Sequence, residues 1–360
     1  MVASLIGEHR YEKVKALGEG TVSVVSKARD RSKKKGDKDR IVAIKKIRMG
    51  HRKDGVNITA LREIKLLQEL SHPNVIGLLD VYAGKNNVNM VIEYCVTDLE
   101  EVIRDRTIFL TPAEIKCCMK MILEGINICH KKWVLHRDLK PSNILVGADG
   151  NLKIADFGLA RLHASPKARL THQVITRWYR PPELLYAARS YGPSVDMWSI
   201  GCIFAELILR IPYLPGDSDI DQLSKIFQAR GTPTKEDWPD HDSLPAFVQF
   251  KETPPPDQRQ FFLAASPEGL DLMNKMLHLN PQKRISAEEA LQHPYFVTEQ
   301  PTPCDAEALL EKIRSGSTVK DKGSPDEEPD ESEADDNNNE SQNAPSALAK
   351  AIGQRKLSFS

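Results

Sequence analysis

Short apolar runs separated by turn and charged residues dominate the N-terminal quarter of the chain. These runs are rich in Val, Ile, Leu and Tyr and predict β-strands at residues 11–17, 22–28, 41–48, 75–82 and 88–94. Residues 59–70 instead repeat their apolar side chains with a helical period, which places Leu61, Ile64 and Leu67 on one side. This part of the chain is therefore predicted to form a small sheet with one helix.

The pattern changes after Asp98, where apolar residues recur at the spacing of long amphipathic helices. Such helices are predicted at residues 112–130, 194–209, 218–229 and 267–277. The second part of the chain is therefore predicted to be a larger and mostly helical domain.

The composition excludes several classes of protein. A chain of 360 residues with 40% hydrophobic and 28% charged residues is typical of a soluble globular protein of one large or two modest domains. No stretch approaches the roughly 18 consecutive apolar residues of a membrane span, so we expect no membrane contact. The six cysteines lack the CxxC spacing of a zinc site or redox pair, and we interpret them as reduced thiols of a cytosolic or nuclear protein.

Charge is distributed unevenly, although the net charge is zero. Residues 320–343 contain ten acidic residues and two lysines, and the depletion of apolar side chains over residues 315–345 predicts disorder. The body is only mildly basic, so we expect no direct binding of nucleic acid. Residues 31–40 are interpreted as a solvated charged loop, and a docking role for Lys33 to Lys35 is the less favoured alternative.

Two weak motifs in the predicted sheet concern phosphate binding. Residues 17–24, Leu-Gly-Glu-Gly-Thr-Val-Ser-Val, place glycines between strands, where backbone amides can approach a phosphate, although such glycines most often mark only a turn. Lys45 ends the apolar run Val-Ala-Ile-Lys, and a buried ammonium needs a partner. Glu63 on the predicted helix is the natural partner, and a lysine head that reaches water is the alternative.

A stronger cluster lies in the helical half of the chain. Residues 136–143 read His-Arg-Asp-Leu-Lys-Pro-Ser-Asn, and an Asp-Phe-Gly that begins at Asp156 follows. Phosphoryl transfer needs hard oxygen ligands for Mg²⁺, which Asn143 and Asp156 can supply. It also needs a carboxylate that orients the attacking hydroxyl, which Asp138 can supply, while Lys140 can neutralise charge on the transferred group. Acidic residues that are merely solvated would not require this spacing.

With these motifs the chain resembles a eukaryotic protein kinase from residue 11 to residue 296. Arg-Pro-Pro-Glu at residues 180–183 is similar to the family's Ala-Pro-Glu. The resemblance implies that Asp196 is buried and structural and that Arg284 pairs with Glu183. It also implies the α+β bilobal kinase fold, with an N-terminal extension (1–10), a small β-sheet N-lobe with one main helix (11–95), a mostly helical C-lobe (96–296) and a largely disordered acidic tail (297–360).

The resemblance further implies ATP and Mg²⁺ as cofactors. Positions that match the family's nucleotide site are Leu17, Gly18, Glu19, Gly20, Val25, Ala43, Lys45, Glu93, Cys95 and Asp98. The implied catalytic residues are Asp138, Lys140, Lys45, Glu63 and Thr176, and the implied metal ligands are Asn143 and Asp156. The hinge, whose backbone should bond adenine, falls at residues 93–95.

Two stretches narrow the resemblance to cyclin-dependent kinases. Residues 57–63, Asn-Ile-Thr-Ala-Leu-Arg-Glu, stand where these kinases carry the helix that a cyclin grips, and residues 171–180 are similar to their activation segment. Three features together, the helix sequence at 59–70, the loop at 214–219 and Ser165-Pro166 ahead of Thr171, most resemble the CDK-activating kinases associated with transcription factor IIH. A cyclin-H-like partner, a RING-finger assembly subunit and location in the nucleus, with the cytoplasm as a second location, are implied.

The same resemblance assigns roles in activation and substrate choice. A phosphate on Thr171, with Ser165 as a further phosphosite, would meet three guanidiniums. These belong to Arg62, Arg137 and Arg161. The substrate pocket comprises Val174, Ile175 and Arg177. Its backbone geometry favours Ser/Thr-Pro sequences. The implied protein substrates are the RNA polymerase II C-terminal repeat and the activation loops of other cyclin-dependent kinases, which lack the proline.

Two other functions stay open from the sequence. Another proline-directed kinase, either a different transcriptional cyclin-dependent kinase or a MAP kinase, is the first. The MAP kinases are disfavoured because His172 and Gln173 follow Thr171 where they would carry Thr-x-Tyr. A catalytically inactive kinase fold that acts as a scaffold is the second, and the intact Lys45 and Asp138 argue against it.

Overall fold

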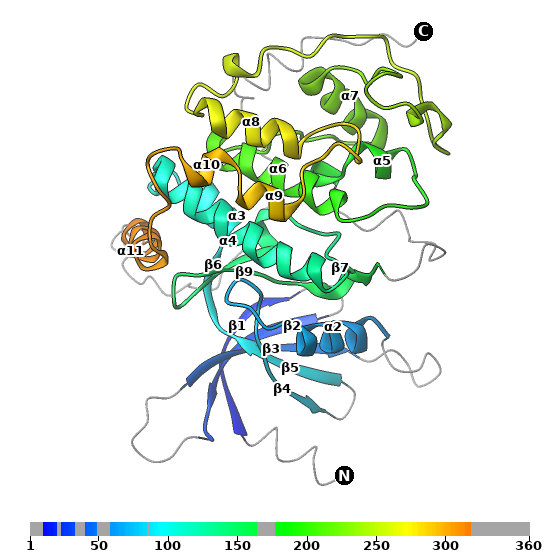
Figure 1. Cartoon of the computed structure of the whole chain (residues 1–360). Coiled ribbons are helices and arrows are strands. Elements are labelled where there is room, and N and C mark those ends of the chain that lie inside the picture. The colour runs from blue at the N-terminus through cyan, green and yellow to red at the C-terminus, as the bar shows by residue number, and fades with distance from the viewer. Residues whose placement is uncertain are drawn as a thin grey trace, which may run out of the picture.

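The computed structural model describes residues 10–19, 23–32, 40–48, 58–84, 87–163 and 177–317. These residues form two lobes, one built on a β-sheet and one mostly helical, which meet near residues 93–98 (Figure 1). The predicted α+β bilobal fold is confirmed.

The N-lobe is a five-stranded antiparallel sheet with the strand order β1-β2-β3-β5-β4. Its strands are β1 (Tyr11–Glu19), β2 (Ser23–Asp30), β3 (Arg40–Arg48), β4 (Leu78–Ala83) and β5 (Asn87–Glu93). The strand predicted at residues 75–82 begins only at Leu78, because Val75 forms an isolated bridge to Ile154 of the other lobe. The remaining predicted strands are confirmed, with boundaries shifted by one or a few residues.

The helix of the N-lobe, α2 (Ile58–Glu69), buries Ile64 and Leu67 as predicted but not Leu61. Ala60, Glu63, Ile64 and Leu67 are buried and follow one another at helical steps of three and four residues. Leu61 lies off this stripe and keeps 49% of its surface exposed, so its predicted place on the buried side is wrong. The helix therefore buries a carboxylate and exposes a leucine.

Four long helices of the C-lobe confirm the predicted ones, with ends that differ by at most one residue. They are α4 (Pro112–Lys131), α6 (Ser194–Leu209), α7 (Asp219–Arg230) and α8 (Pro267–Met276). Shorter helices are α3 (Leu99–Arg104), α5 (Pro182–Leu185), α9 (Ala287–Leu291) and α10 (Pro294–Val297), and 3-10 turns are η1 (Pro141–Asn143), η2 (Phe157–Leu159), η3 (Arg177–Tyr179), η4 (His241–Ser243) and η5 (Gln258–Gln260). A capping box fixes the start of α4, where Thr111 accepts from the Glu114 amide and Glu114 bonds back.

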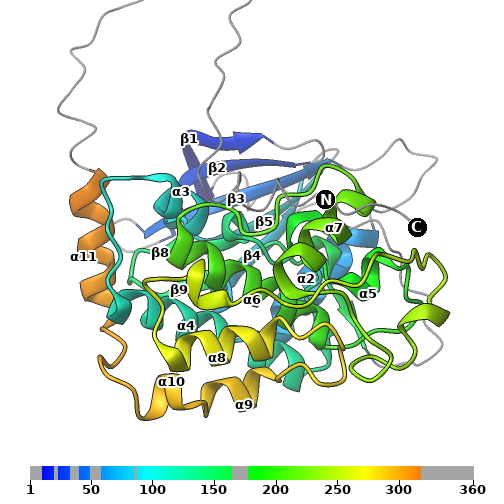
Figure 2. The ribbon, with the colours of Figure 1, turned by 90° about the horizontal axis from the view of Figure 1, so that it is seen from above.

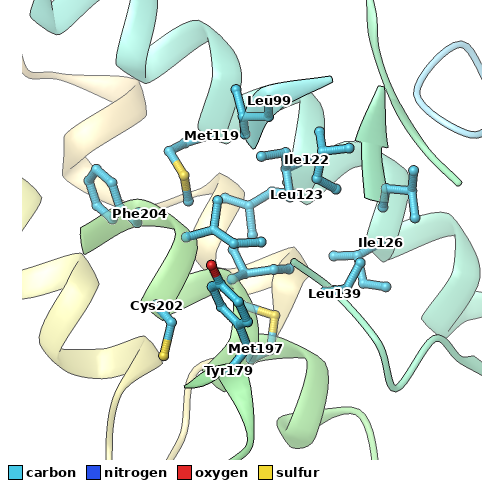
Figure 3. Close-up of a cluster of buried hydrophobic side chains, with 14 of the residues drawn as sticks. Leu99, Met119, Ile122, Leu123, Ile126, Leu139, Tyr179, Met197, Cys202 and Phe204 are labelled. Atoms are coloured by element: carbon cyan, nitrogen blue, oxygen red, sulfur yellow. The ribbon is translucent and has the colours of Figure 1, made fainter. Parts of the chain in front are cut away.

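The core of the C-lobe lies between α4 and α6 (Figure 3). Met119, Ile122, Leu123 and Ile126 of α4 and Phe204 of α6 are each at most 1% exposed. Burial of one such side chain contributes about 1.5–3 kcal/mol. Nearly every residue of α6 is buried, and residues 136–143, the predicted catalytic loop, are bonded to this helix through Asp196.

Two small sheets carry the segments between the lobes. One has the order β6-β8-β9, with β6 (Cys95–Asp98), β8 (Ile144–Gly147) and β9 (Leu152–Ile154), and the other pairs β7 (Val134–Leu135) with β10 (Arg161–Leu162). Because β5 ends at Glu93 and β6 begins at Cys95, only Tyr94 separates the sheets of the two lobes. Residues 136–143 run between β7 and β8.

A further helix, α11 (Ala306–Ser317), stands beside α4 at one edge of the molecule (Figure 2). Its residues Leu309, Leu310 and Ile313 are buried. The segment predicted as a largely disordered tail, residues 297–360, is therefore folded as far as the end of α11. Residues 318–360 lie outside the described residues.

All six cysteines are free thiols. Among the described residues, no helix combines the length and the apolar character that crossing a membrane requires.

Candidate functional site

A cavity of about 1000 Å³ lies between the lobes, and side chains of both lobes line it. The positions that were assigned to the nucleotide and line this cavity are Leu17, Gly18, Val25, Ala43, Lys45, Glu93, Cys95 and Asp98. Asn143 and Asp156 line it from the C-lobe. The structure thus brings the candidate nucleotide and metal residues to one place. Gly20 and the side chain of Glu19 lie outside the described residues.

Lys45 of β3 and Glu63 of α2 form the ion pair that their spacing suggested. The Lys45 Nζ lies 2.8 Å from the Glu63 Oε1 and 3.1 Å from the Asp156 Oδ1. Burial by itself would lower the pKa of Lys45, but the two carboxylates outweigh burial and raise it. Burial raises the pKa of Glu63, and Lys45 opposes that rise. The ammonium is therefore held charged at the floor of the cavity, where it can meet phosphate oxygens.

Asp156 reaches the cavity from a backbone in the left-handed region, with φ of 63°. This conformation costs a non-glycine residue about 1–3 kcal/mol and is found mostly at functional sites. Phe157, the next residue, is fully buried, and its ring packs edge-on against His136 with 4.9 Å between ring centroids. Burial would raise the pKa of Asp156, but Lys45 outweighs burial and lowers it. The Asp156 side chain is thus an ionised carboxylate that Lys45 holds in place.

Asp138 and Asn143 face each other across the catalytic loop. The Asn143 Nδ2 donates to the Asp138 carbonyl at 2.7 Å and to the Asp138 Oδ2 at 3.1 Å. The Lys140 Nζ lies 3.2 Å from the same Oδ2. Because the amide nitrogen of Asn143 points to Asp138, its Oδ1 is the atom left to face a cation. The carboxylate of Asp138 is 6% exposed and is oriented by both neighbours.

The catalytic loop is anchored to α6 through Asp196, which is fully buried. Its carboxylate accepts from the backbone amides of His136 at 3.0 Å and Arg137 at 2.8 Å, and from the His130 Nε2 at 2.9 Å. Burial would raise the pKa of Asp196, but the His130 hydrogen bond and these amides outweigh burial and lower it. The buried position that the resemblance implied for Asp196 is confirmed.

A second buried ion pair joins α5 to the segment between α8 and α9. The Arg284 Nη1 lies 2.8 Å from the Glu183 Oε1, and its Nη2 donates to the Glu183 Oε2 at 3.1 Å. Both side chains are nearly unexposed, and the bidentate geometry compensates for the cost of removing two charges from water. The partner that was expected for Arg284 is confirmed.

Three arginines gather between α2, the catalytic loop and β10. Burial lowers the pKa of Arg161, and the positive charges of Arg62 and Arg137 lower it further. Arg137 already makes hydrogen bonds within the protein, since its Nη1 donates to the Tyr191 hydroxyl at 2.8 Å and its Nε to the Leu159 carbonyl at 2.8 Å. Three close cations favour an anion among them.

Several assigned residues lie outside the described residues. They are Asn57, Ser165, Thr171, Val174, Ile175 and Thr176. Arg177 is described, and its Nε lies 3.1 Å from the Asp219 Oδ1 at the start of α7. Arg180 reaches the same oxygen at 3.2 Å, so one carboxylate holds both arginines against α7.

Sequence reasoning missed two parts of this site. His130, at the end of α4, supplies a hydrogen bond to Asp196, and its position among apolar residues suggested no partner. Tyr179 donates to the buried Glu206 of α6 at 2.7 Å, which fixes the residues ahead of the Arg-Pro-Pro-Glu motif. The only signal for Glu206 was a second carboxylate, besides Asp196, inside a largely apolar helix.

Comparisons with known proteins agree with this geometry. The family described as protein kinase domain matches residues 11–296. The chain is 54% identical over 296 residues to Cyclin-dependent kinase D-1 of Arabidopsis thaliana, which covers 82% of this chain and 73% of that protein. It is 52% identical over 315 residues to Cyclin-dependent kinase 7 of Xenopus laevis, an alignment that covers 84% of this chain and 88% of that protein. It is 48% identical over 308 residues to Serine/threonine-protein kinase KIN28 of Saccharomyces cerevisiae, with 85% of this chain and 98% of that protein covered.

A solved structure shares the fold. It is the CAK complex from Chaetomium thermophilum bound to ATP-gamma-S, and the superposition has a TM-score of 0.79 with 44% sequence identity. It covers 84% of this chain and 96% of that one.

Proposed function

The chain belongs to the protein kinase family, as a serine/threonine kinase of the cyclin-dependent branch, and we propose that it phosphorylates two kinds of protein. These are the activation segments of other cyclin-dependent kinases and the C-terminal repeat of RNA polymerase II. The observation that carries the catalytic part is the joint placement of Lys45, Glu63 and Asp156 in one cavity. The alternative is a kinase that acts on the polymerase repeat alone.

In this proposal the adenine of ATP lies against the backbone of residues 93–95 and the triphosphate extends toward Lys45. Glu93, Cys95, Lys45 and Asp156 all line the cavity. The likeness to a solved complex that is bound to ATP-gamma-S supports ATP as the nucleotide. Glu63 keeps the Lys45 ammonium directed toward the phosphates, because its Oε1 lies only 2.8 Å from the Lys45 Nζ.

Asn143 and Asp156 fit Mg²⁺, since an amide oxygen and an ionised carboxylate are the hard ligands that this ion prefers. When bound, Mg²⁺ neutralises charge that develops on the transferred phosphoryl group. The metal is part of the proposal, and the chain's own contribution is the fixed position of these two oxygens. Asn143 is positioned by its bonds to Asp138, and Asp156 by its bond to Lys45.

Phosphoryl transfer then requires that a substrate hydroxyl face the γ-phosphorus in line with the leaving oxygen. Asp138 accepts the hydrogen bond of that hydroxyl and receives its proton as the new O–P bond forms and the bond to the β-phosphate oxygen breaks. Lys140, 3.2 Å from the Asp138 carboxylate, offers positive charge to the transferred group. Thr176 belongs to the proposed catalytic set but lies outside the described residues.

A cyclin-H-like partner is proposed to grip the helix that carries Glu63. Leu61 leaves 49% of its surface exposed on α2, and a partner that covered it would remove apolar surface from water. A phosphate on Thr171 would be drawn to Arg62, Arg137 and Arg161, whose mutual repulsion it would relieve. Assembly with a RING-finger subunit and location in the nucleus complete the proposal.

The test is transfer of radiolabelled phosphate by the full chain, alone and with a cyclin-H-type partner. The acceptors are a Ser-Pro heptad peptide and an inactive cyclin-dependent kinase. Asp138→Asn should reduce transfer by about 10²–10⁴-fold, and the surface variant Asp240→Asn should leave it unchanged. Transfer to both acceptors supports the proposal. Transfer to the peptide alone favours the alternative, and ATP binding without transfer under any condition would favour a scaffold.

A further inference from the structure

Lys153 is a buried lysine that the mechanism above does not use. It occupies the middle of β9 between Leu152 and Ile154, and its side chain is only 7% exposed. The Lys153 Nζ lies 2.9 Å from the Glu93 Oε2 and 3.5 Å from the Asp149 Oδ2. It also donates to the Pro73 carbonyl at 3.0 Å.

These three partners belong to different parts of the molecule. Glu93 ends β5 of the N-lobe sheet, Pro73 lies between α2 and β4, and Asp149 lies in the turn between β8 and β9 of the C-lobe. A single ammonium therefore joins the last residue of the N-lobe sheet to the C-lobe sheet that follows it. The Glu93 amide also donates to the Gly77 carbonyl at 3.1 Å, so both the backbone and the side chain of Glu93 are held.

Lys153 remains charged although its side chain is buried. Burial by itself would lower the pKa of Lys153, but Glu93 and Asp149 outweigh burial and raise it. Burial would raise the pKa of Asp149, but the Asn151 hydrogen bond and Lys153 outweigh burial and lower it. Ionised groups on three elements are thus held against one another, and removal of the central cation would leave two carboxylates to repel each other.

Two glycines lie against the side chains of this cluster, where a Cβ would contact them. A Cβ on Gly77 would stand 2.8 Å from the Glu93 Oε1, and a Cβ on Gly147 would stand 2.8 Å from the Lys153 Cε. Side chains at these two positions would displace Glu93 and Lys153. Both glycines therefore serve the same cluster.

The cluster lies directly behind the proposed adenine site. Glu93 and Cys95 line the cavity, and Cys95 pairs with Gly147 of β8, the strand beside β9. Burial raises the pKa of the Cys95 thiol to about 12. Lys153 is not among the described residues that line the cavity, so it can act on a nucleotide only through the hinge.

We propose that Lys153 is a positioning residue for nucleotide binding. By holding Glu93 and the β8–β9 turn together, it fixes the backbone groups of residues 93–95 in the place where adenine contacts them. This inference rests on the proposed ATP site. Because the contact concerns adenine and not the reacting phosphate, loss of Lys153 affects ground-state and transition-state binding alike. It raises the KM for ATP and leaves kcat unchanged.

The test uses the full chain with its cyclin-H-type partner and compares Lys153→Met with Lys153→Arg. We expect Lys153→Met to raise the KM for ATP by about threefold to tenfold, with unchanged kcat and unchanged KM for the acceptor peptide, and Lys153→Arg to restore most of the loss. Lys131→Met removes a lysine of another ion pair, with the exposed Glu288, and is the matched control that should behave as the parent.

Binding of nucleotide fragments separates a hinge effect from a general loss of structure. Adenosine should bind Lys153→Met more weakly by the same factor as ATP, whereas inorganic tripolyphosphate with Mg²⁺ should bind as it does to the parent. An unchanged KM for ATP, or a fall in kcat with constant KM, would overturn the inference, as would an arginine variant no better than methionine.

If Lys153→Met does not fold, Asp149→Asn decides the question, because Asp149 is the exposed partner of Lys153 and does not line the cavity. A raised KM for ATP supports the inference and an unchanged one overturns it. A parent protein that fails to use ATP at all would instead refute the proposed function.

Discussion

The two halves of the catalytic site are supported in different ways. On the C-lobe side, Asp138 belongs to a loop whose backbone is bonded to the fully buried Asp196. On the N-lobe side, Lys45 is positioned by Glu63 of α2, a helix that also exposes Leu61. The C-lobe half is thus held by hydrogen bonds to a side chain inside the core. The N-lobe half depends on one ion pair and on a helix with an exposed apolar residue.

This difference indicates where regulation acts. A loop that is bonded to a buried carboxylate cannot shift without breaking the core of its lobe. A helix with an exposed apolar residue can be held or displaced by a partner at small cost to the rest of the fold. We infer that the catalytic loop is preformed and that a cyclin-type partner sets the position of α2 and of Glu63.

The largest expected effect concerns the C-lobe half. Asp196→Ala removes the acceptor of two backbone amides and of His130 inside the core, which should lower the free energy of unfolding by about 3–5 kcal/mol. Urea unfolding followed by fluorescence measures this change. Asp242→Ala, in an exposed ion pair with Lys235, is the control and should leave the urea midpoint unchanged. A loss below about 1 kcal/mol for Asp196→Ala, the worth of an ordinary hydrogen bond, would contradict the anchoring role.

The next effect concerns the N-lobe half and appears in activity. Glu63→Gln keeps the shape of the side chain but removes the charge that holds the Lys45 ammonium. A hydrogen bond between charged groups is worth about 1.5–3 kcal/mol, so kcat/KM should fall about tenfold to a hundredfold. Steady-state kinetics with saturating partner measures the change, and circular dichroism checks that the variant is folded. Activity within twofold of the parent would show that Glu63 does not position Lys45.

A smaller effect is expected at the exposed face of α2. Leu61→Asp should weaken binding of the cyclin-type partner about tenfold, since it would place an unpaired carboxylate in the interface. The thermal stability of the isolated chain should not change, because Leu61 is half exposed in it. Leu263→Asp, at a leucine that is 87% exposed on the C-lobe, is the matched control. Equal partner affinity in the two variants would place the interface elsewhere.

The smallest effect is a pH dependence of C-lobe stability. Burial raises the pKa of Glu206 from 4.5 to about 7, although the hydrogen bond from Tyr179 opposes this rise. Between these pH values the folded state retains a proton that the unfolded state has lost, so stability falls as the pH rises through this window. Glu206→Gln should lack this part of the decline. Parallel melting-temperature curves for the parent and the variant would refute the assignment.

Much of the site could be predicted from the sequence because its chemistry is local. Residues 136–143 and the Asp-Phe-Gly at Asp156 are recognisable from their order and spacing in the sequence. A lysine inside an apolar strand needs a carboxylate partner, which Glu63 provides. The pair of Arg284 and Glu183 and the burial of Asp196 followed from a family resemblance and not from local pattern. The structure confirms both placements.

Other features depend on contacts that no local pattern encodes. Lys153 sits in an apolar strand as Lys45 does, but its partners Glu93 and Asp149 come together only when the two lobes are joined. The helical period alone could not decide that Leu61 faces away from the core, since neighbouring stripes of α2 are both partly apolar. The helix α11 was missed because its few apolar residues border a polar tail, and they become a buried face only against α4.

Hydrogen exchange of the full chain, measured with and without a cyclin-H-type partner, tests the central claim most directly. We predict that amides of α2, residues 58–69, become strongly protected when the partner binds. Amides of the catalytic loop, residues 136–143, should be protected equally in both states, because Asp196 already holds them. Partner-induced protection of the catalytic loop as large as that of α2 would contradict a preformed C-lobe half.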